Sequence, residues 1–238
     1  MSAIQDKIAN IQARIQRAAQ RAQRDPDSVL LVAVSKTKTA ADVRAAAACG
    51  LTDFAENYLQ EALEKITASA ALKLHWHFIG PVQSNKTKLI AQSFNWVHSV
   101  DRIKIAQRLS DQRPPQLGPL NICLQVNIDR EASKSGLMPE QLTEVAGTIA
   151  QLPNLKLRGL MAIPERRHQL EDQRQPFRQL RLLKAQINSQ LDNCQKLDTL
   201  SMGMSADLEA AIQEGATMVR IGTDIFGARD ATSNPRVE

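Results

Sequence analysis

The chain has 238 residues, of which 43% are hydrophobic and 23% charged, a balance typical of folded globular proteins that argues against disorder. No run approaches the roughly 20 apolar residues needed to cross a bilayer, and the N-terminus lacks the apolar stretch of a secretion signal. The net charge of +5 raises the possibility of nucleic acid binding, but the basic residues are dispersed and aromatic residues are scarce. We therefore expect neither nucleic acid nor membrane binding.

The first half of the chain alternates between apolar runs that suit buried strands and patterns that suit helices. A helix over residues 3–22 is expected first, with an apolar stripe formed by Ile4, Ile8, Ile11 and Ile15. Strands follow at 29–35, 52–56, 74–80 and 95–100. Helices should follow each of these strands, and their starts are predicted at three caps: Thr39 with Asp42 in a capping box, Ser84, and Asp101.

The second half repeats this alternation. Strands are expected at 120–128, 155–163, 197–202 and 217–222. The helices between them should start at Pro139, span about 170–191, and start at a cap formed by Ser205. A polar tail is expected at about 230–238.

Eight strand and helix pairs behind one extra N-terminal helix predict an α/β protein whose residues 1–238 form a single-domain (β/α)8 TIM barrel. The alternative, an open doubly wound sheet, usually has fewer units and a glycine-rich first turn of the GxGxxG type, which is absent. No low-complexity linker divides the chain, and we expect a monomer.

The densest basic segment, ERRHQLEDQRQPFRQLRLLK at 165–184, interleaves six basic residues with three acidic ones. This pattern favours a solvated helix face. An anionic small ligand that uses part of it is the alternative.

The three cysteines, Cys49, Cys123 and Cys194, are odd in number and widely spaced, which predicts reduced thiols and a cytoplasmic protein. His75 and His77 share one face of a predicted strand, but no third ligand has suitable spacing. No metal site is expected.

Small residues follow the seventh and eighth strands, in SMGMS at 201–205 and RIGT at 220–223. Barrels often bind phosphate at these positions, where glycine exposes backbone N–H groups and hydroxyls add donors. Turn and cap chemistry uses the same residues, so that interpretation stays open. Asp207 and Glu209 would oppose an anion near Ser205, which makes the loop after the eighth strand at least as important.

Lys36 directly follows the apolar run VLLVAVS, at the end of a barrel strand where active sites form. Its plain interpretation is a surface lysine whose charged head reaches solvent. Partial burial beside Lys38 would instead favour the neutral amine, which can form a Schiff base with an aldehyde. A phosphate site, such an amine and a strand-end arginine, Arg220, together suit the vitamin B6 cofactor pyridoxal 5′-phosphate (PLP).

Six separated blocks carry a family resemblance: AVSKTK, FAENYLQEALEK, WHFIGPVQSNK, LRGLMAIP, TLSMGMSADLEAAI and VRIGTDIFGAR. Between Leu30 and Arg229, in this order, they resemble the pyridoxal phosphate homeostasis protein family, whose members are related to the N-terminal barrel of alanine racemase. Ala55 departs from the pattern, because the family usually has glycine before Glu-Asn-Tyr. A methyl group there should be tolerated if the φ angle is negative.

The resemblance implies a PLP site in which Lys36 carries the Schiff base and Arg220 faces the pyridine nitrogen. It also implies that the phosphate is held near the last two strands. The residues implied to bind the cofactor are Lys36, Asn57, Ser201, Met204, Ser205, Arg220, Gly222 and Thr223, with the phosphate assigned to Ser201, Gly222 and Thr223. No residue is assigned a catalytic role.

The resemblance further implies storage, buffering or delivery of PLP, with PLP-dependent apoenzymes as possible acceptors. The alternative is a weak amino-acid racemase. Arginine at the pyridine nitrogen only donates a hydrogen bond, which weakens carbanion chemistry. Racemases of the related barrel also use a tyrosine from a separate domain of a partner subunit, and we expect no such domain in this chain. Its sole tyrosine, Tyr58, should begin a barrel helix.

A carrier must also release its cargo, which requires an amine to displace Lys36 by transimination. Lys38, Lys86 and Lys134 lie on loops after strands and are candidates, although each is also a plain surface lysine. A barrel that binds nucleic acid or a protein partner without cofactor is the remaining alternative if Lys36 is inert.

Overall fold

A computed structural model describes residues 3–227 and contains a closed barrel of eight parallel strands in sequence order. The strands are β1 (Leu30–Val34), β2 (Asp53–Glu56), β3 (His75–Phe78), β4 (Trp96–Val100), β5 (Leu120–Gln125), β6 (Leu155–Met161), β7 (Thr199–Ser201) and β8 (Met218–Ile221). β1 pairs with both β2 and β8, which closes the barrel. The predicted single-domain (β/α)8 barrel is confirmed.

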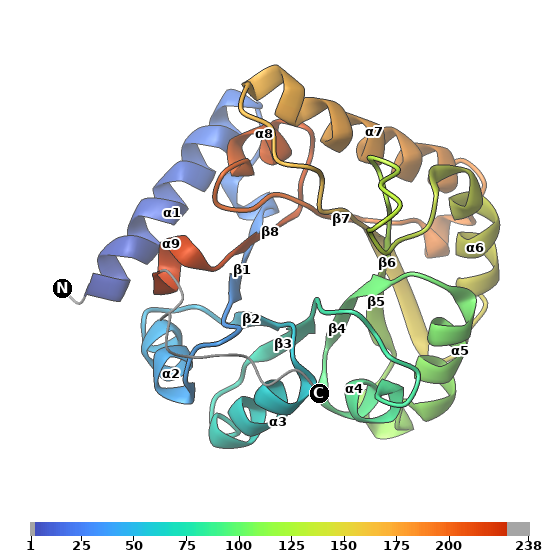
Figure 1. The fold of residues 1–238 in the computed structure, drawn as a ribbon, viewed down its shortest axis with the longest axis horizontal. Coiled ribbons are helices and arrows are strands. Elements are labelled where there is room, and N and C mark those ends of the chain that lie inside the picture. The colour runs from blue at the N-terminus through green and yellow to red at the C-terminus, as the bar shows by residue number, and fades with distance from the viewer. Residues whose placement is uncertain (1–2, 228–238) are drawn as a thin grey trace.

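The helices form a ring around the strands (Figure 1). They are α1 (Ala3–Arg21), α2 (Ala40–Ala48), α3 (Leu59–Ala68), α4 (Thr87–Ser93), α5 (Ile103–Gln112), α6 (Leu142–Ile149), α7 (Leu170–Asn188), α8 (Leu208–Gln213) and α9 (Thr223–Phe226). Short 3₁₀ helices lie at Pro26–Ser28, Pro115–Leu117, Pro139–Gln141 and Asn193–Gln195. The extra helix α1 packs against α8 and α9 with its predicted stripe, of which Ile8, Ile11 and Ile15 are buried.

One of the predicted helix caps is confirmed. At the start of α2, the Thr39 side chain accepts from the Asp42 N–H, and the Asp42 carboxylate accepts from the Thr39 N–H. The cap predicted at Ser84 is wrong, because a turn intervenes and α4 begins only at Thr87. There the Ser84 carbonyl oxygen accepts a hydrogen bond from the Thr87 hydroxyl at 2.9 Å.

The caps predicted at Asp101 and Ser205 are also wrong. The Asp101 carboxylate binds the guanidinium of Arg102, and Arg102 is the residue that precedes α5. α8 follows Asp207, whose carboxylate accepts from the backbone N–H of Met204 and so closes the turn before the helix. In both places the carboxylate has a local partner other than a helix N–H group.

Apolar side chains form two layers, one inside the barrel and one between the barrel and the helices. The inner layer consists of Val32, Ala55, Trp96, Cys123, Met161 and Met218. Along β1, Leu31 and Ala33 belong to the outer layer, while Val32 belongs to the inner one. Alternation of this kind follows from the two-residue period of a strand and explains why β1 is almost wholly apolar.

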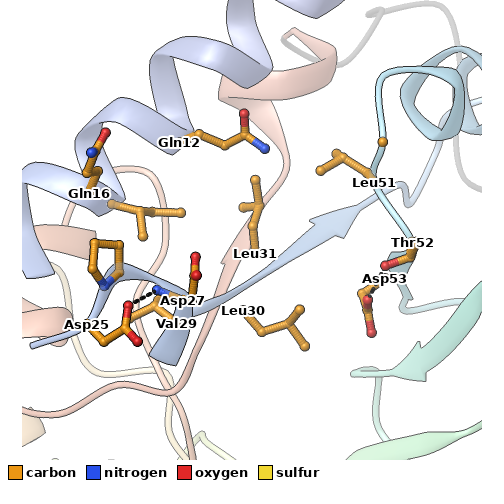
Figure 2. Close-up of a pocket in the computed structure, with 13 residues that line it drawn as sticks. Gln12, Gln16, Asp25, Asp27, Val29, Leu30, Leu31, Leu51, Thr52 and Asp53 are labelled. Carbon is orange, nitrogen blue, oxygen red and sulfur yellow. Dashed lines mark hydrogen bonds between the residues drawn. The ribbon is translucent and has the colours of Figure 1, made fainter.

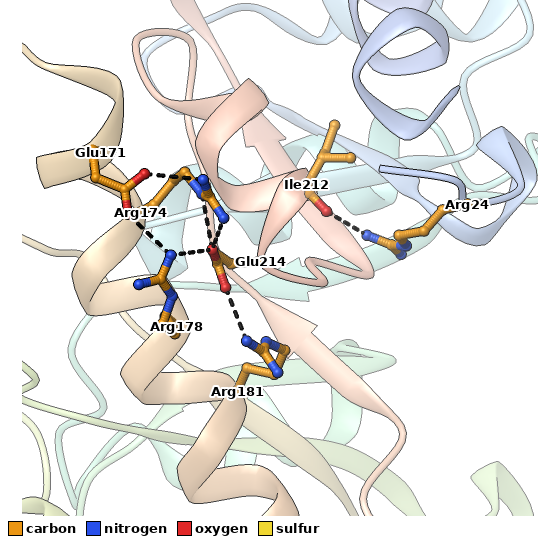
Figure 3. Close-up of polar contacts among 7 residues, drawn as sticks. All are labelled: Arg24, Glu171, Arg174, Arg178, Arg181, Ile212 and Glu214. Carbon is orange, nitrogen blue, oxygen red and sulfur yellow. Dashed lines mark hydrogen bonds and ion pairs between the residues drawn. The ribbon is translucent and has the colours of Figure 1, made fainter. Parts of the chain in front are cut away.

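The arginines of the basic segment in α7 are not simply solvated. Arg174, Arg178 and Arg181 converge on Glu214 at the end of α8, with N–O distances of 2.7, 3.3 and 3.1 Å (Figure 3). The Glu214 side chain is only 2% exposed. The predicted solvated face therefore also serves as an ion-pair contact that ties α7 to α8.

The three cysteines are free thiols, and burial raises the pKa of Cys123 to about 12. No helix within residues 3–227 combines the length and apolar character needed to cross a membrane. The same residues contain no group of three or more histidine, cysteine or acidic side chains that could hold a metal. The tail predicted at 230–238 lies outside the described residues.

Candidate functional site

Lys36 lies at the carboxyl end of β1, where the ladder of β1 and β2 continues past the end of the strand. The Ser35 N–H still donates to the Ala55 carbonyl oxygen at 3.0 Å. Alternation along the chain places Lys36 on the same side as Val32 and Val34, which pack inside the barrel. Lys36 is half-buried. A lysine there can present its amine to the barrel mouth.

Helix α3 holds the two peptide groups that flank Lys36. The Lys65 ammonium donates to the Ser35 carbonyl oxygen at 2.8 Å, and the Thr37 N–H donates to the Glu61 carboxylate at 3.1 Å. Thr37 has a φ of +63°, a left-handed conformation that is rare for a β-branched residue. The chain therefore makes a strained turn directly after Lys36, and α3 fixes that turn from both sides.

A buried ion pair lies behind Lys36, between the barrel and α3. The Glu56 Oε1 atom accepts from the Lys65 ammonium at 2.8 Å and from the Ser35 hydroxyl at 2.6 Å. The side chains of Glu56 and Lys65 are 0% and 6% exposed. Burial raises the pKa of Glu56 even though Lys65 opposes this shift. The second oxygen, Oε2, has no hydrogen-bond partner among the described residues.

Arg220 occupies the barrel interior on β8. Its position pairs with Val32 of β1, so it lies deeper in the barrel than Lys36. The guanidinium donates to the Ser201 hydroxyl at 2.6 Å and to the Ala162 carbonyl oxygen at 3.0 Å. Burial lowers the pKa of Arg220 to about 10, which still leaves it charged at neutral pH.

A line of buried polar side chains continues from Ser201 across the interior. Ser201 Oγ lies 2.7 Å from His98 Nδ1, His98 Nε2 lies 2.9 Å from His77 Nδ1, and His77 Nε2 lies 3.0 Å from Asp53 Oδ1. Burial lowers the pKa of His77, and it lowers the pKa of His98 well below its usual value. Both rings are therefore neutral at pH 7.

The loops after β7 and β8 hold the other predicted cofactor-binding residues. Gly222 lies against β1, since a Cβ atom there would come within 3.1 Å of the Val34 carbonyl oxygen. Thr223 is exposed at the start of α9. Met204 is 36% exposed, and Ser205 is half-buried with its carbonyl oxygen bound by Arg14. The described hydrogen bonds of the Arg220 guanidinium go to Ser201 and Ala162, not to Met204 or Ser205.

Asn57 lines a cavity of about 350 Å³ at the mouth, together with Asn127 and Lys134. Its backbone lies so close to Gly80 that a Cβ atom on Gly80 would stand 2.1 Å from the Asn57 carbonyl oxygen. Glycine is required there because any side chain would displace Asn57. The structure thus brings two predicted residues, Asn57 and Lys134, to one cavity.

A larger cavity, of about 560 Å³, lies at the opposite end of the barrel, between α1 and the starts of β1 and β2 (Figure 2). None of the predicted site residues lines it. Asp53, the end of the buried polar line, is one of its lining residues, and the Thr52 hydroxyl donates to the Asp53 carboxylate at 2.7 Å. The polar line therefore reaches from this cavity to Arg220.

Sequence reasoning missed the role of the interior histidines. His98 lies within β4, and its side chain is inside the barrel. The alternation of Trp96 and His98 along β4 was the available signal. His77 also lies inside the barrel, in contact with His98. Ala55 is buried in the inner layer without a positive φ, so its methyl group is tolerated as predicted.

Comparison with known proteins gives a consistent set of relatives. The family described as alanine racemase, N-terminal domain, matches residues 7–230. The pyridoxal phosphate homeostasis protein of Pseudomonas aeruginosa is 63% identical over 230 residues, which cover 97% of each chain. The protein of the same name from Escherichia coli K12 is 48% identical over 233 residues, covering 97% of this chain and 98% of its own.

Solved structures agree in fold. PipY of Synechococcus elongatus with PLP bound has a TM-score of 0.81 and 35% identity over 94% of this chain and all of its own. Its structure without PLP has a TM-score of 0.83 and 36% identity, with the same coverage. Alanine racemase from Corynebacterium glutamicum, at 14% identity and a TM-score of 0.68, covers 97% of this chain and 62% of its own and shares the fold.

Proposed function

The chain belongs to the alanine racemase N-terminal domain family, and we propose that it holds PLP as a Schiff base on Lys36 and serves intracellular PLP homeostasis. One observation carries this proposal. Lys36 lies at the interior rim of β1, and Arg220, which is buried and cationic, lies deeper in the same barrel. Relatives named for PLP homeostasis, and a related structure titled with PLP bound, support it.

The donor set suits each part of the cofactor. Lys36 would supply the amine for a Schiff base with the cofactor aldehyde, with loss of water. Gly222 and Thr223 offer backbone and hydroxyl donors at the rim for the phosphate. Ser201 accepts from Arg220 and contacts His98, so one lone pair of its hydroxyl remains available. Its predicted phosphate contact, and the predicted cofactor contacts of Met204 and Ser205, stay predictions.

A carrier is a better interpretation than a racemase. Arg220 can only donate to the pyridine nitrogen, so it cannot make the ring a strong electron sink. Tyr58, the sole tyrosine, precedes α3 and is 40% exposed, which does not suit a buried acid or base inside the barrel. We propose storage, buffering or delivery to PLP-dependent apoenzymes by a monomeric cytoplasmic protein.

Release would occur by transimination, in which an incoming amine takes the aldehyde carbon and Lys36 leaves as a free amine. Lys134 is the best placed of the three candidate lysines, because it lines the mouth cavity with Asn57. Replacing Lys38, Lys86 and Lys134 together by alanine should slow release. An unchanged release rate in this triple variant would eliminate an internal amine as the displacing group.

An absorbance spectrum tests the proposal directly. Purified protein incubated with PLP and freed of excess ligand should show the visible-edge band of a Schiff base, and Lys36→Ala should lack it. Lys73→Ala, at an exposed lysine, is the matched control and should keep the band. Borohydride reduction followed by peptide mapping should place the adduct on Lys36. A wild-type protein that stays colourless contradicts the proposal.

A further inference from the structure

Five side chains from five strands form one unbroken line through the barrel interior. Asp53, His77, His98, Ser201 and Arg220 come from β2, β3, β4, β7 and β8, and each contacts the next at 2.6–3.0 Å. All five are at most 6% exposed. The line begins at the cavity at the amino end of the barrel, where Figure 2 shows Asp53. It ends at the guanidinium that faces the proposed cofactor.

The two ends of this line dictate every proton position between them. Arginine only donates, so the Ser201 oxygen accepts from Arg220 and its own O–H donates to His98 Nδ1. A neutral His98 then carries its proton on Nε2 and donates it to His77 Nδ1. His77 in turn carries its proton on Nε2 and donates it to the Asp53 carboxylate, which only accepts. The line has one consistent direction.

We infer that Asp53 is a remote positioning residue of the candidate site: its carboxylate fixes both histidine tautomers and, through Ser201, the orientation of Arg220. Among the described residues, no carboxylate bonds Arg220 directly, so the nearest hydrogen-bonded countercharge is the one at the far end of the line. The bearing of this arrangement on PLP rests on the proposed function, whereas the tautomers can be measured without cofactor.

The first test is ¹H–¹⁵N correlation spectroscopy of the histidine rings at pH 7 without PLP, which is tractable because the chain has four histidines. Wild type should show His77 and His98 both protonated at Nε2. An Nδ1 proton on either ring of the wild-type protein would overturn the inference. This test requires no variant.

Asp53→Asn tests whether the Asp53 carboxylate fixes the tautomers of His77 and His98. Its amide can donate to His77 Nε2, which permits the reverse direction, so we expect a gain of the Nδ1–H tautomer at both His77 and His98. Asp25→Asn, at a carboxylate that lines the same cavity outside the line, is the control and should leave both rings unchanged. Unchanged rings in Asp53→Asn would overturn the inference.

A second measurement separates this inference from the proposed function. In Asp53→Asn, the dissociation constant for PLP should rise by about two- to tenfold, the effect of one weakened hydrogen bond, with no change in Asp25→Asn. If Asp53→Asn alters the tautomers but leaves the PLP dissociation constant unchanged, Asp53 organises only the barrel interior, and its role at the PLP site is refuted. If wild type fails to bind PLP, the proposed function fails, while the tautomer result still decides whether Asp53 orients the line.

Discussion

Two buried polar clusters lie on opposite sides of the barrel wall, and they differ in how completely their atoms are paired. Within residues 3–227, four buried side-chain polar atoms lack a hydrogen-bond partner, and none of them belongs to the interior line from Asp53 to Arg220. The exterior cluster of Ser35, Glu56 and Lys65 leaves the Glu56 Oε2 atom without one. Beside this cluster, Thr37 adopts its strained left-handed turn.

The difference matches the proposed tasks of the two sides. A buried network whose atoms are paired is rigid and specifies one arrangement, which suits the proposed role of the Arg220 guanidinium as a donor to the pyridine nitrogen. Under the proposed function Lys36 has the opposite requirement, because its amine would exchange partners each time PLP is loaded or released. Strain and an incompletely paired carboxylate next to that residue are consistent with a site that moves between two states.

Removing one partner of the exterior ion pair should have the largest effect on stability. Lys65→Met leaves the Glu56 carboxylate buried without its cation and should lower the free energy of unfolding by about 3–5 kcal/mol in urea titrations. The double variant Lys65→Met with Glu56→Leu should recover most of this loss, because a buried pair replaced by apolar residues costs little. Lys73→Met, at an exposed lysine, is the control. A loss below 1 kcal/mol in the single variant would mean that water reaches Glu56.

Breaking the interior line should have the next largest effect. Ser201→Ala leaves a guanidinium N–H and the His98 Nδ1 atom unsatisfied and should cost about 1–3 kcal/mol of unfolding free energy. Ser69→Ala is a closely matched control, since Ser69 is 3% exposed and its hydroxyl has no partner among the described residues. Equal losses in the two variants would show that the hydrogen bonds of Ser201 contribute nothing.

The buried histidines predict a specific loss of stability in mild acid. Their pKa values are lowered in the folded protein from 6.5, so below pH 6.5 the unfolded chain binds protons that the folded protein does not. Stability should therefore fall as the pH drops, by up to about 1.4 kcal/mol per pH unit for each histidine. The groups that face the pair are Asp53, His75, Arg220 and the hydroxyl of Ser201.

Unfolding free energies measured between pH 7 and pH 5 test this slope. His98→Gln should show a smaller slope than wild type, whereas the exposed His168→Gln should show the same slope. Identical slopes in wild type and His98→Gln would mean that His98 titrates normally, in conflict with a neutral interior line.

Strand and helix periodicity was sufficient to predict the barrel, because β1 and the other strands carry apolar side chains on both faces and helices follow them. The residues at the rim, Lys36 and Asn57, were equally visible, since they come directly after strands. The helix starts at Ser84 and Asp101 were misplaced for a local reason. A turn separates Ser84 from α4, and the Asp101 carboxylate binds a neighbouring arginine. Sequence spacing cannot distinguish either situation from a helix cap.

The two polar clusters were beyond sequence reasoning for a different reason. Asp53 and Arg220 are 167 positions apart and meet only through side chains of three other strands. From the sequence, Lys65 resembles any lysine on a helix surface. Only the packing of α3 against the barrel shows that it binds Glu56. Contacts of this kind form when the barrel closes, and the local hydrophobic periodicity of the sequence does not reveal them.

Relief of the strain at Thr37 should have the smallest effect and the opposite sign. Glycine removes the roughly 1–2 kcal/mol cost of a left-handed L-residue but adds about 0.5–1 kcal/mol of chain entropy, so Thr37→Gly should stabilise the protein by up to about 1.5 kcal/mol. The Glu61 contact to the backbone N–H survives the change. Thr39→Gly, where φ is −80°, is the neighbouring control and should lose a few tenths of a kcal/mol. If Thr37→Gly instead destabilises the protein, the Thr37 side chain stabilises the turn. The backbone next to the exterior cluster is then not strained, and the contrast with the interior line fails.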